Sequence, residues 1–183
     1  MSNEAATTAE QVLAFWFSHR DNWWKKSPEF DAEVRDRFQA LHAVLLRGDH
    51  DAWREEARSA LAYVIVLDQL SRNMFRDQAR MYVGDTAALE AARTAIERGF
   101  DAGLGEVERS FLYMPCMHSE ALADQERSVA LFAAVGNDYN SRYAVQHRDI
   151  VARFGRFPHR NALLGRASTE EETEFLKQPG SSF

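Results

Sequence analysis

The sequence contains a single cysteine, Cys116, among 183 residues. One cysteine cannot form an internal disulfide, which fits a reducing compartment, so we expect the protein to be cytoplasmic. Its apolar runs are short: the run from Leu61 to Leu67 is far below the ~20 residues that a membrane-spanning helix needs. The opening MSNEAATTAE carries Glu4 and no basic residue, unlike a secretory signal peptide. We therefore expect no membrane partner.

Positive charge is also in short supply, because the formal net charge is −6. Binding to nucleic acid depends on many lysine and arginine contacts with phosphates, so we expect no nucleic-acid partner. The chain lacks a Gly-rich phosphate loop, a His-Glu-x-x-His helix, a Gly-x-Ser-x-Gly elbow and a cysteine pair. Its histidines and carboxylates have no recognised metal-ligand spacing. We expect neither a metal nor a cofactor.

Only four prolines and nine glycines interrupt the chain, which leaves room for long helices. No stretch alternates convincingly between apolar and polar residues, so we predict no sheet. Helical periodicity instead predicts an all-α protein of about eight helices packed as antiparallel hairpins. We expect one domain over residues 1–183, with its core in residues 7–178 and a frayed tail at 179–183.

Local signals set the expected helix boundaries. Ser27 can cap a helix that has Pro28 at its first position and Gly48 just beyond its end. Pro115 is expected to stop a helix, and Ser119 to cap the next one. A capping box opens the last helix in either of two registers near residue 169. The helices that we expect cover residues 8–18, 28–46, 59–75, 85–98, 105–114, 119–136, 138–154 and 168–177.

An aspartate and an arginine interrupt the most apolar of these helices. At 100° per residue, Asp68 and Arg72 share one side with Leu61 and Ile65. An isolated charge there costs several kcal/mol, so the two pair with each other or with a facing helix. One reading is a buried ion pair that fixes the helix register, and the other is a place in a pocket. Arg76, one turn after Arg72, places a further charged side chain on the same side of the helix.

Two more polar residues lie on apolar helix faces. His147 shares its side with Tyr143 and Val151, and Gln125 lies beside Leu122 and Val129. A histidine in such a place is commonly a core residue with its hydrogen bonds satisfied, and a functional role is the alternative.

His118 and Glu120 follow Pro115 in the string FLYMPCMHSE. The break expected at Pro115 places both at the start of a new helix, where free backbone N–H groups favour anions. Glu120 there can simply interact with the helix dipole, and a role in binding is the alternative.

The string RFGRFPHRNALLGR, residues 153–166, is the strongest concentration of positive charge. Pro158 fixes a bend, so His159, Arg160 and Asn161 emerge from a constrained turn. Arginine is suited to bidentate recognition of carboxylate and phosphate groups. The alternative is that these arginines tie the C-terminal segment to helix carbonyls and carboxylates.

The strings LDQLSRNMFR, FLYMPCMHSE, ADQERSV and RFGRFPHRNALLGR, with WF near the start, are together typical of one family. Over nearly its whole length the chain resembles the uncharacterised family catalogued as domain of unknown function nine-two-four. The resemblance implies an all-α fold similar to tetratricopeptide-like helical hairpins, and no established activity comes with it. The polar positions that are characteristic of the family include Gln69 and Asn73 of this sequence, besides the residues already discussed.

We expect one polar pocket inside the helical stack and a small anionic ligand or an acidic peptide end as its partner. The residues expected to bind it are Asp68, Arg72, Arg76, His118, Glu120, Gln125, His147, Arg156, His159, Arg160 and Asn161. An enzyme is the alternative, with His118, His147 or His159 as general acid or base and arginine as stabiliser. A third reading, a protein-interaction scaffold, follows from fold analogy. The sequence carries no signal for the oligomeric state.

Overall fold

The computed structural model describes residues 7–183, and every regular element in that range is a helix. The expected all-α class is therefore confirmed. The chain divides into two compact units, residues 1–76 with 80–115 and residues 77–79 with 116–183. That residues 1–183 form a single domain stays a prediction.

The first unit begins with two helices whose starts follow from their side chains. Thr8 and Gln11 form a capping box at the start of α1 (Ala9–Ser18). Ser27 caps α2 (Pro28–Leu46) through a hydrogen bond with the Phe30 N–H. Both starts agree with the sequence prediction. The expected core stripe of α2 is buried, and it consists of Phe30, Val34, Phe38, Leu41 and Leu45.

The third predicted helix, residues 59–75, is not a regular α-helix throughout. After the 3₁₀ segment η2 (Asp51–Glu55), α3 (Ala57–Val64) runs into the π-helical segment η3 (Ile65–Leu70), and α4 (Ser71–Met74) follows. A π-helical turn bonds each N–H one residue further back than an α-helical turn does. The guanidinium of Arg72 donates to the backbone carbonyl of Asp68 at 2.6 Å. A period of 3.6 residues does not reveal this change, because the apolar residues continue through it.

The start of α5 (Asp85–Glu97) lies directly against the π-helical segment. A Cβ atom on Gly84 would lie 2.4 Å from the carbonyl oxygen of Leu67, so this close approach requires glycine. The buried face of α5 consists of small side chains, which let α5 pack closely on α3; they are Ala88, Ala91, Ala92 and Ala95.

The sequence prediction for Pro115 is wrong. α6 spans Glu106–His118 and continues through this proline. Proline removes one backbone hydrogen bond from a helix interior. The residues from Phe111 to Met117 are buried, and this burial stabilises the helix in spite of the missing N–H. His118 therefore ends α6, and it does not open the next helix.

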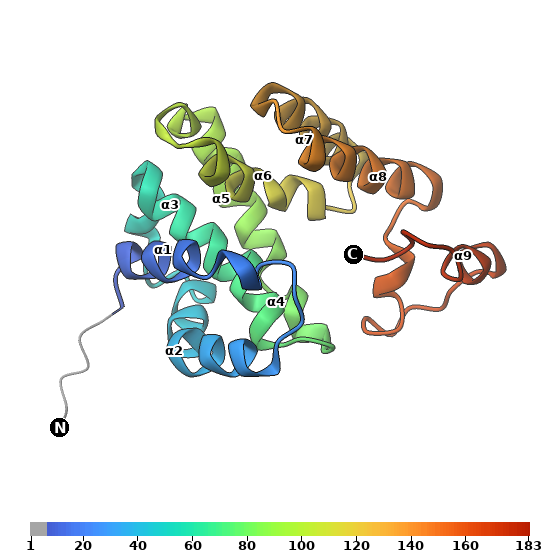
Figure 1. Ribbon diagram of the computed structural model, residues 1–183, viewed down its shortest axis with the longest axis horizontal. Coiled ribbons are helices and arrows are strands. Elements are labelled where there is room, and N and C mark those ends of the chain that lie inside the picture. Colours follow the sequence, from blue (N-terminus) through green and yellow to red (C-terminus); the bar gives the residue numbers. More distant parts are fainter. Residues whose placement is uncertain (1–6) are drawn as a thin grey trace. The chain divides into compact units, whose positions relative to one another are not determined.

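Within the second unit, α7 (Leu122–Val135) and α8 (Asp138–Phe154) lie side by side as a hairpin (Figure 1). Gly136, with a φ of 83°, joins them. The expected cap at Ser119 is wrong, because α7 has Ala121 at its N-cap and Ser119 bonds to Asp124. The apolar cluster of this unit lies on α8, on the segment that follows it and on α9 (Glu170–Phe175). It contains Ile150, Val151, Phe154, Phe157 and Phe175.

The C-terminal residues, which the sequence predicts to be frayed, contact the second unit. The hydroxyl of Ser181 donates to the carbonyl of Leu176 at 3.1 Å, and Ser181 is buried. The ring of Phe183 stacks on the ring of His147 with 3.7 Å between centroids. These contacts depend on where one aromatic ring packs, which a Gly/Ser-rich composition does not show, and the frayed tail at 179–183 stays a prediction.

No helix within residues 7–183 is both long enough and apolar enough to cross a lipid bilayer.

We expect Gly84→Ala to lower the free energy of unfolding by about 1–3 kcal/mol, because the new methyl group clashes with the Leu67 carbonyl. Urea denaturation of the two proteins measures the difference. Gly103→Ala is the matched control, since a Cβ atom there meets nothing within 4 Å. Equal losses of stability for the two variants would show that the contact between α5 and the π-helical segment does not need glycine.

Candidate functional site

The Asp68–Arg72 pair that the sequence predicts is present in the first unit. Nη1 of Arg72 lies 3.1 Å from Oδ1 of Asp68 and 2.9 Å from Oδ1 of Asp85, at the start of α5. Burial opposes the charged form of Arg72, but the two carboxylates outweigh it and raise the pKa of the guanidinium above its usual value. This arrangement joins the π-helical segment to α5, as expected of an ion pair that fixes helix register.

Arg76 makes a separate pair within the same unit. Its Nε and Nη2 atoms lie 2.6 and 2.9 Å from the two carboxylate oxygens of Asp31, in the first turn of α2. Asn73 donates to the same carboxylate at 2.8 Å. Burial raises the pKa of Asp31, and the hydrogen bonds from Arg76 and Asn73 more than offset this, so its pKa is lowered.

In the second unit, two arginines of the basic string form bidentate pairs with carboxylates. Arg156 holds Glu172, at 2.6 and 2.8 Å, and Arg166 holds Glu120, at 2.7 and 2.9 Å. Glu120 also accepts the N–H of Phe157 at 2.8 Å. These bonds tie the segment after α8 to α9 and to the α6–α7 connection. The structural alternative left open by the sequence therefore describes these two arginines.

Glu120 does not lie in the first turn of a helix, where the sequence predicts it, because it follows the end of α6 and precedes the start of α7. Burial raises its pKa, but the hydrogen bonds from Arg166 and from the Phe157 N–H lower the pKa by more than burial raises it. The net pKa shift is therefore downward. The hydrogen bonds of Arg156 are the largest cause that lowers the pKa of Glu172 to about 2. Both carboxylates are thus held ionised by arginine at neutral pH.

Three histidines and one arginine gather in the second unit, and we call them the histidine cluster: His118, His147, His159 and Arg160. His118 and His147 have ring centroids 6.2 Å apart. The guanidinium of Arg160 donates to the backbone carbonyl of His118 at 2.9 Å, and its Cζ lies 4.6 Å from the ring centroid of Phe157. The Phe157 ring in turn contacts His147 and His159, with centroids 5.5 and 5.6 Å away.

The histidine cluster favours uncharged imidazole rings. Burial lowers the pKa of His147 to about 3, and the charges of His118, Arg160 and His159 add to this effect. Burial and the charge of Arg160 lower the pKa of His159 to about 4, although Glu120 opposes the change. Both rings are therefore neutral at pH 7. Burial is the largest cause of both shifts, and the positive charge of Arg160 adds to each of them.

One imidazole nitrogen of the cluster lacks a partner. Nδ1 of His159 is buried and has no hydrogen bond. Nδ1 of His147, by contrast, lies 2.7 Å from the carbonyl of Tyr143, one turn earlier on α8. A buried polar atom without a partner costs free energy, and such an atom is a place where a ligand or a water molecule is stabilised.

Gln125 connects the end of α6 to α7. Its Nε2 atom donates to the carbonyls of Met117 and Ser119, at 2.6 Å each. Its Oε1 atom and the hydroxyl of Ser128, one turn later, are buried and have no hydrogen-bond partner. Asn161 has a structural role as well, since it donates to Ser168 at 3.0 Å and accepts from Arg166 at 2.9 Å.

The expected binding residues therefore fall into separate groups. Asp68, Arg72 and Arg76 belong to the first unit, and the remaining residues belong to the second. Within the second unit, Arg156 and Asn161 bond around Glu172, while the three histidines gather with Arg160. That the groups of both units share one pocket stays a prediction.

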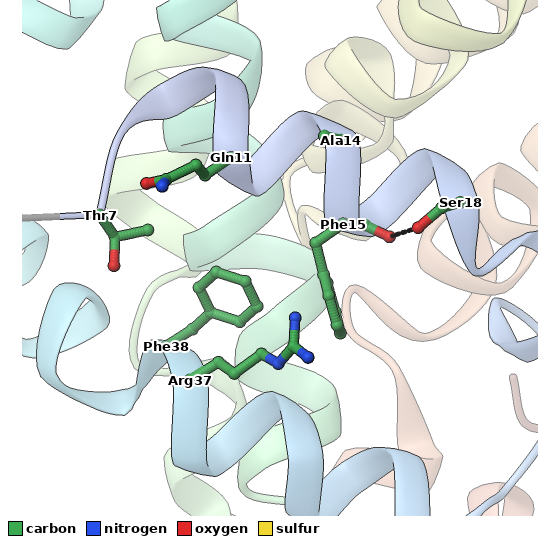
Figure 2. A pocket seen from close by; sticks show the side chains of 7 residues that line it. All are labelled: Thr7, Gln11, Ala14, Phe15, Ser18, Arg37 and Phe38. Carbon is green, nitrogen blue, oxygen red and sulfur yellow. Dashed lines mark hydrogen bonds between the residues drawn. The ribbon is translucent and has the colours of Figure 1, made fainter.

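A hollow of about 580 Å³ lies elsewhere, between α1 and α2 (Figure 2). It contains none of the residues that the sequence predicts for binding. Phe15, Phe38 and Arg37 point into it, and the guanidinium of Arg37 lies 4.9 Å from the Phe15 ring centroid. Arg37 also pairs with Glu33 at 2.8 Å. In residues 7–183, no group of three or more His, Cys, Asp or Glu side chains is arranged to hold a metal ion.

Sequence reasoning missed three important residues of the second unit. Arg166 stands in the basic string, but the sequence carries no signal that Glu120 is its partner. Glu172 forms the capping box with Thr169, which is one of the two registers that the sequence left open, and its pair with Arg156 carries no local signal. Phe183 carries no sequence signal, because its packing on His147 depends on the path of the chain.

These helices and side chains define an all-α protein with arginine–carboxylate pairs in both units and a histidine cluster in the second. The chain belongs to a family of bacterial proteins of unknown function, DUF924, whose model matches residues 12–180. The resemblance found in the sequence is thus confirmed.

The chain is also similar to a solved structure, that of a protein of unknown function, ATU0120, from Agrobacterium tumefaciens. The two sequences are 42% identical, and the structures superpose with a TM-score of 0.88. The match covers 92% of this chain and 96% of the other. No curated protein matches the chain.

We expect the free energy of unfolding to decrease as the pH falls from about 6.5 towards 3. Unfolded histidine has a pKa of about 6.5, whereas folding lowers the pKa of His147 to about 3 and that of His159 to about 4. The unfolded state therefore binds more protons in this window, and each histidine adds a slope of up to about 1.4 kcal/mol per pH unit.

Urea denaturation at a series of pH values measures this slope. His147→Gln removes the proton uptake of one buried imidazole, so the slope between pH 6.5 and 3 should become smaller. His42 in the first unit, whose pKa burial lowers to about 4, supplies the comparison His42→Gln. An unchanged slope in His147→Gln would mean that this ring is already charged in the native protein.

Proposed function

We propose that the protein is a binding module for a small anionic ligand, with a carboxylate or phosphate group that contacts the histidine cluster. Arg156 and Arg166 hold Glu172 and Glu120, whereas His159 and Arg160 of the same string lie with His118 and His147 in the histidine cluster. The observation that carries the proposal is the unpartnered, buried Nδ1 of His159 beside Arg160.

An anion is the ligand that best fits the charges of the cluster. His118, His159 and Arg160 each contribute to lowering the pKa of His147, because a positive charge beside the ring disfavours its protonation. The one carboxylate that opposes this for His159 is Glu120, which Arg166 already holds. A bound anion would offset these charges, raise the histidine pKa values and couple binding to proton uptake. The end of an acidic peptide carries the same chemical group.

A second candidate is an enzyme that uses His118, His147 or His159 as general acid or base, and the gathering of these rings beside Arg160 supports it. General acid–base catalysis works best with a pKa near the working pH. An imidazole with a pKa of about 3 or 4 is a weak base, so this role requires a bound anion that raises its pKa. Catalysis therefore depends on the same anion binding, which is the reason for proposing binding first.

Two further features belong to the proposal. A tetratricopeptide-like arrangement is supported by the α7–α8 hairpin, in which two antiparallel helices pack along their length. A cytoplasmic location is supported by the single cysteine, which suits a reducing compartment.

Calorimetric titration with inorganic phosphate and with succinate tests the proposed function. We expect binding to the native protein, with an enthalpy that varies with the ionisation enthalpy of the buffer, because the histidines take up protons. Arg160→Gln and His159→Gln should each weaken binding about 10-fold or more, since each removes a hydrogen bond to a charged group.

Arg153→Gln is the matched control, because Arg153 stands in the same basic string but pairs with Glu171 and is half exposed. It should bind as the native protein does. Circular dichroism and thermal unfolding establish that each variant is folded. Binding that is retained in both Arg160→Gln and His159→Gln would place the anion elsewhere and refute the proposal.

A further inference from the structure

The ring of Phe183 lies among four other rings of the second unit. It stacks on His147 at 3.7 Å, with an interplanar angle of 20°. His159 and Phe157 meet it nearly edge-on, at centroid distances of 5.9 and 6.5 Å. Tyr143, one turn before His147, lies 6.3 Å away. We call these four surrounding residues the aromatic cage: Tyr143, His147, Phe157 and His159.

The chain reaches the cage by a short and lightly held segment. The hydroxyl of Ser181 fixes the segment to Leu176, and Gly180 turns it with a φ of 78°. Beyond Ser181, the ring contacts are the interactions that place Phe183. Its relative exposure is 48%, so the ring covers the cage without being enclosed by it. Such a ring can leave the cage when a competing ring takes its place.

The cage also adjoins the positive charge of the histidine cluster. His147 and His159 belong to both, and the Arg160 guanidinium lies over the Phe157 ring at 4.6 Å. A molecule whose ring stacks on His147 can therefore carry an anionic group towards His159 and Arg160 over a short linker. Stacking on the face of His147 suits a flat aromatic ring, and a puckered saturated ring of similar size fits less well.

We propose that the aromatic cage is a binding subsite for an aromatic ring, and that Phe183 is its resident occupant, displaced when an aromatic carboxylate binds. The proposal of a ring subsite depends only on the geometry of the aromatic cage. The preference for a carboxylate rests on the proposed function of the histidine cluster. The segment from Ser181 to Phe183 thus acts as a strap. The Phe183 ring competes with the ligand for the cage, and this competition lowers the apparent affinity of the protein for the ligand.

Calorimetric titration with 3-phenylpropionate, 3-cyclohexylpropionate and propionate tests this proposal in the native protein and in Phe183→Ala. An aromatic pair changes an equilibrium by about 2- to 12-fold. We therefore expect Phe183→Ala to bind 3-phenylpropionate about 2- to 12-fold more tightly than the native protein does. The affinity for propionate should not change, and the phenyl compound should bind more tightly than the cyclohexyl compound.

Tyr139→Ala is the matched control. Tyr139 is also an aromatic residue of relative exposure 48%, and it contacts Tyr143 at 4.8 Å but is not part of the cage. The Tyr139→Ala variant should bind 3-phenylpropionate with the same affinity as the native protein. Phe183→Leu provides a second variant that retains an apolar side chain. Its affinity for 3-phenylpropionate should lie between the affinities of the native protein and of Phe183→Ala.

A further probe, 3-phenylpropan-1-ol, separates the ring subsite from the anion site because it lacks the carboxylate. Tighter binding of this alcohol to Phe183→Ala, with no binding of propionate or phosphate to either protein, would support the cage and refute the proposed function. Equal affinities of the native protein and Phe183→Ala for 3-phenylpropionate and for the alcohol would overturn the cage. Equal affinities for the phenyl and cyclohexyl compounds would overturn it too. Binding of phosphate would then still support the proposed function.

Discussion

Bidentate pairs between arginine and carboxylate determine how the second unit of this protein is assembled. The segment after α8 has little regular structure, and its path is fixed where Arg156 meets Glu172 and where Arg166 meets Glu120. Planar guanidinium and carboxylate groups form two parallel hydrogen bonds, which set direction as well as distance. Because each pair joins residues far apart in sequence, the turn that carries His159 and Arg160 is held against the end of α6.

This use of arginine explains why a concentration of positive charge is compatible with an acidic protein. Two of the arginines of the basic string are neutralised by partners that are themselves partly or fully buried. Arg160 donates to the backbone carbonyl of His118, and its charge adds to the burial that lowers the pKa of His147. The imidazoles of His147 and His159 are neutral at pH 7, because their pKa values are lowered to about 3 and about 4. The arginines of the basic string are thus held by more than one kind of partner within the second unit.

The aromatic rings complete the same region. His147 and Phe157 are buried, and they pack on one another and on His159 and Phe183. The first unit shows the contrasting case, in which Arg72 lies between Asp68 and Asp85 and links the π-helical segment to α5. A positive charge between two carboxylates is offset locally, and here it links two helical segments.

The sequence by itself determined the helical class, the start of α2 at Ser27 and Pro28, and the pairing of Asp68 with Arg72, because capping and contacts one turn apart are local. It also singled out the four residues of the histidine cluster: His147 stands on an apolar helix face, and His118, His159 and Arg160 stand in the strings around Pro115 and Pro158. Only the tertiary structure decided that α6 continues through Pro115, that Glu172 and Glu120 are the partners of Arg156 and Arg166, and that Phe183 covers His147. Those outcomes depend on burial and on contacts between distant segments, for which neighbouring residues in the chain carry no signal.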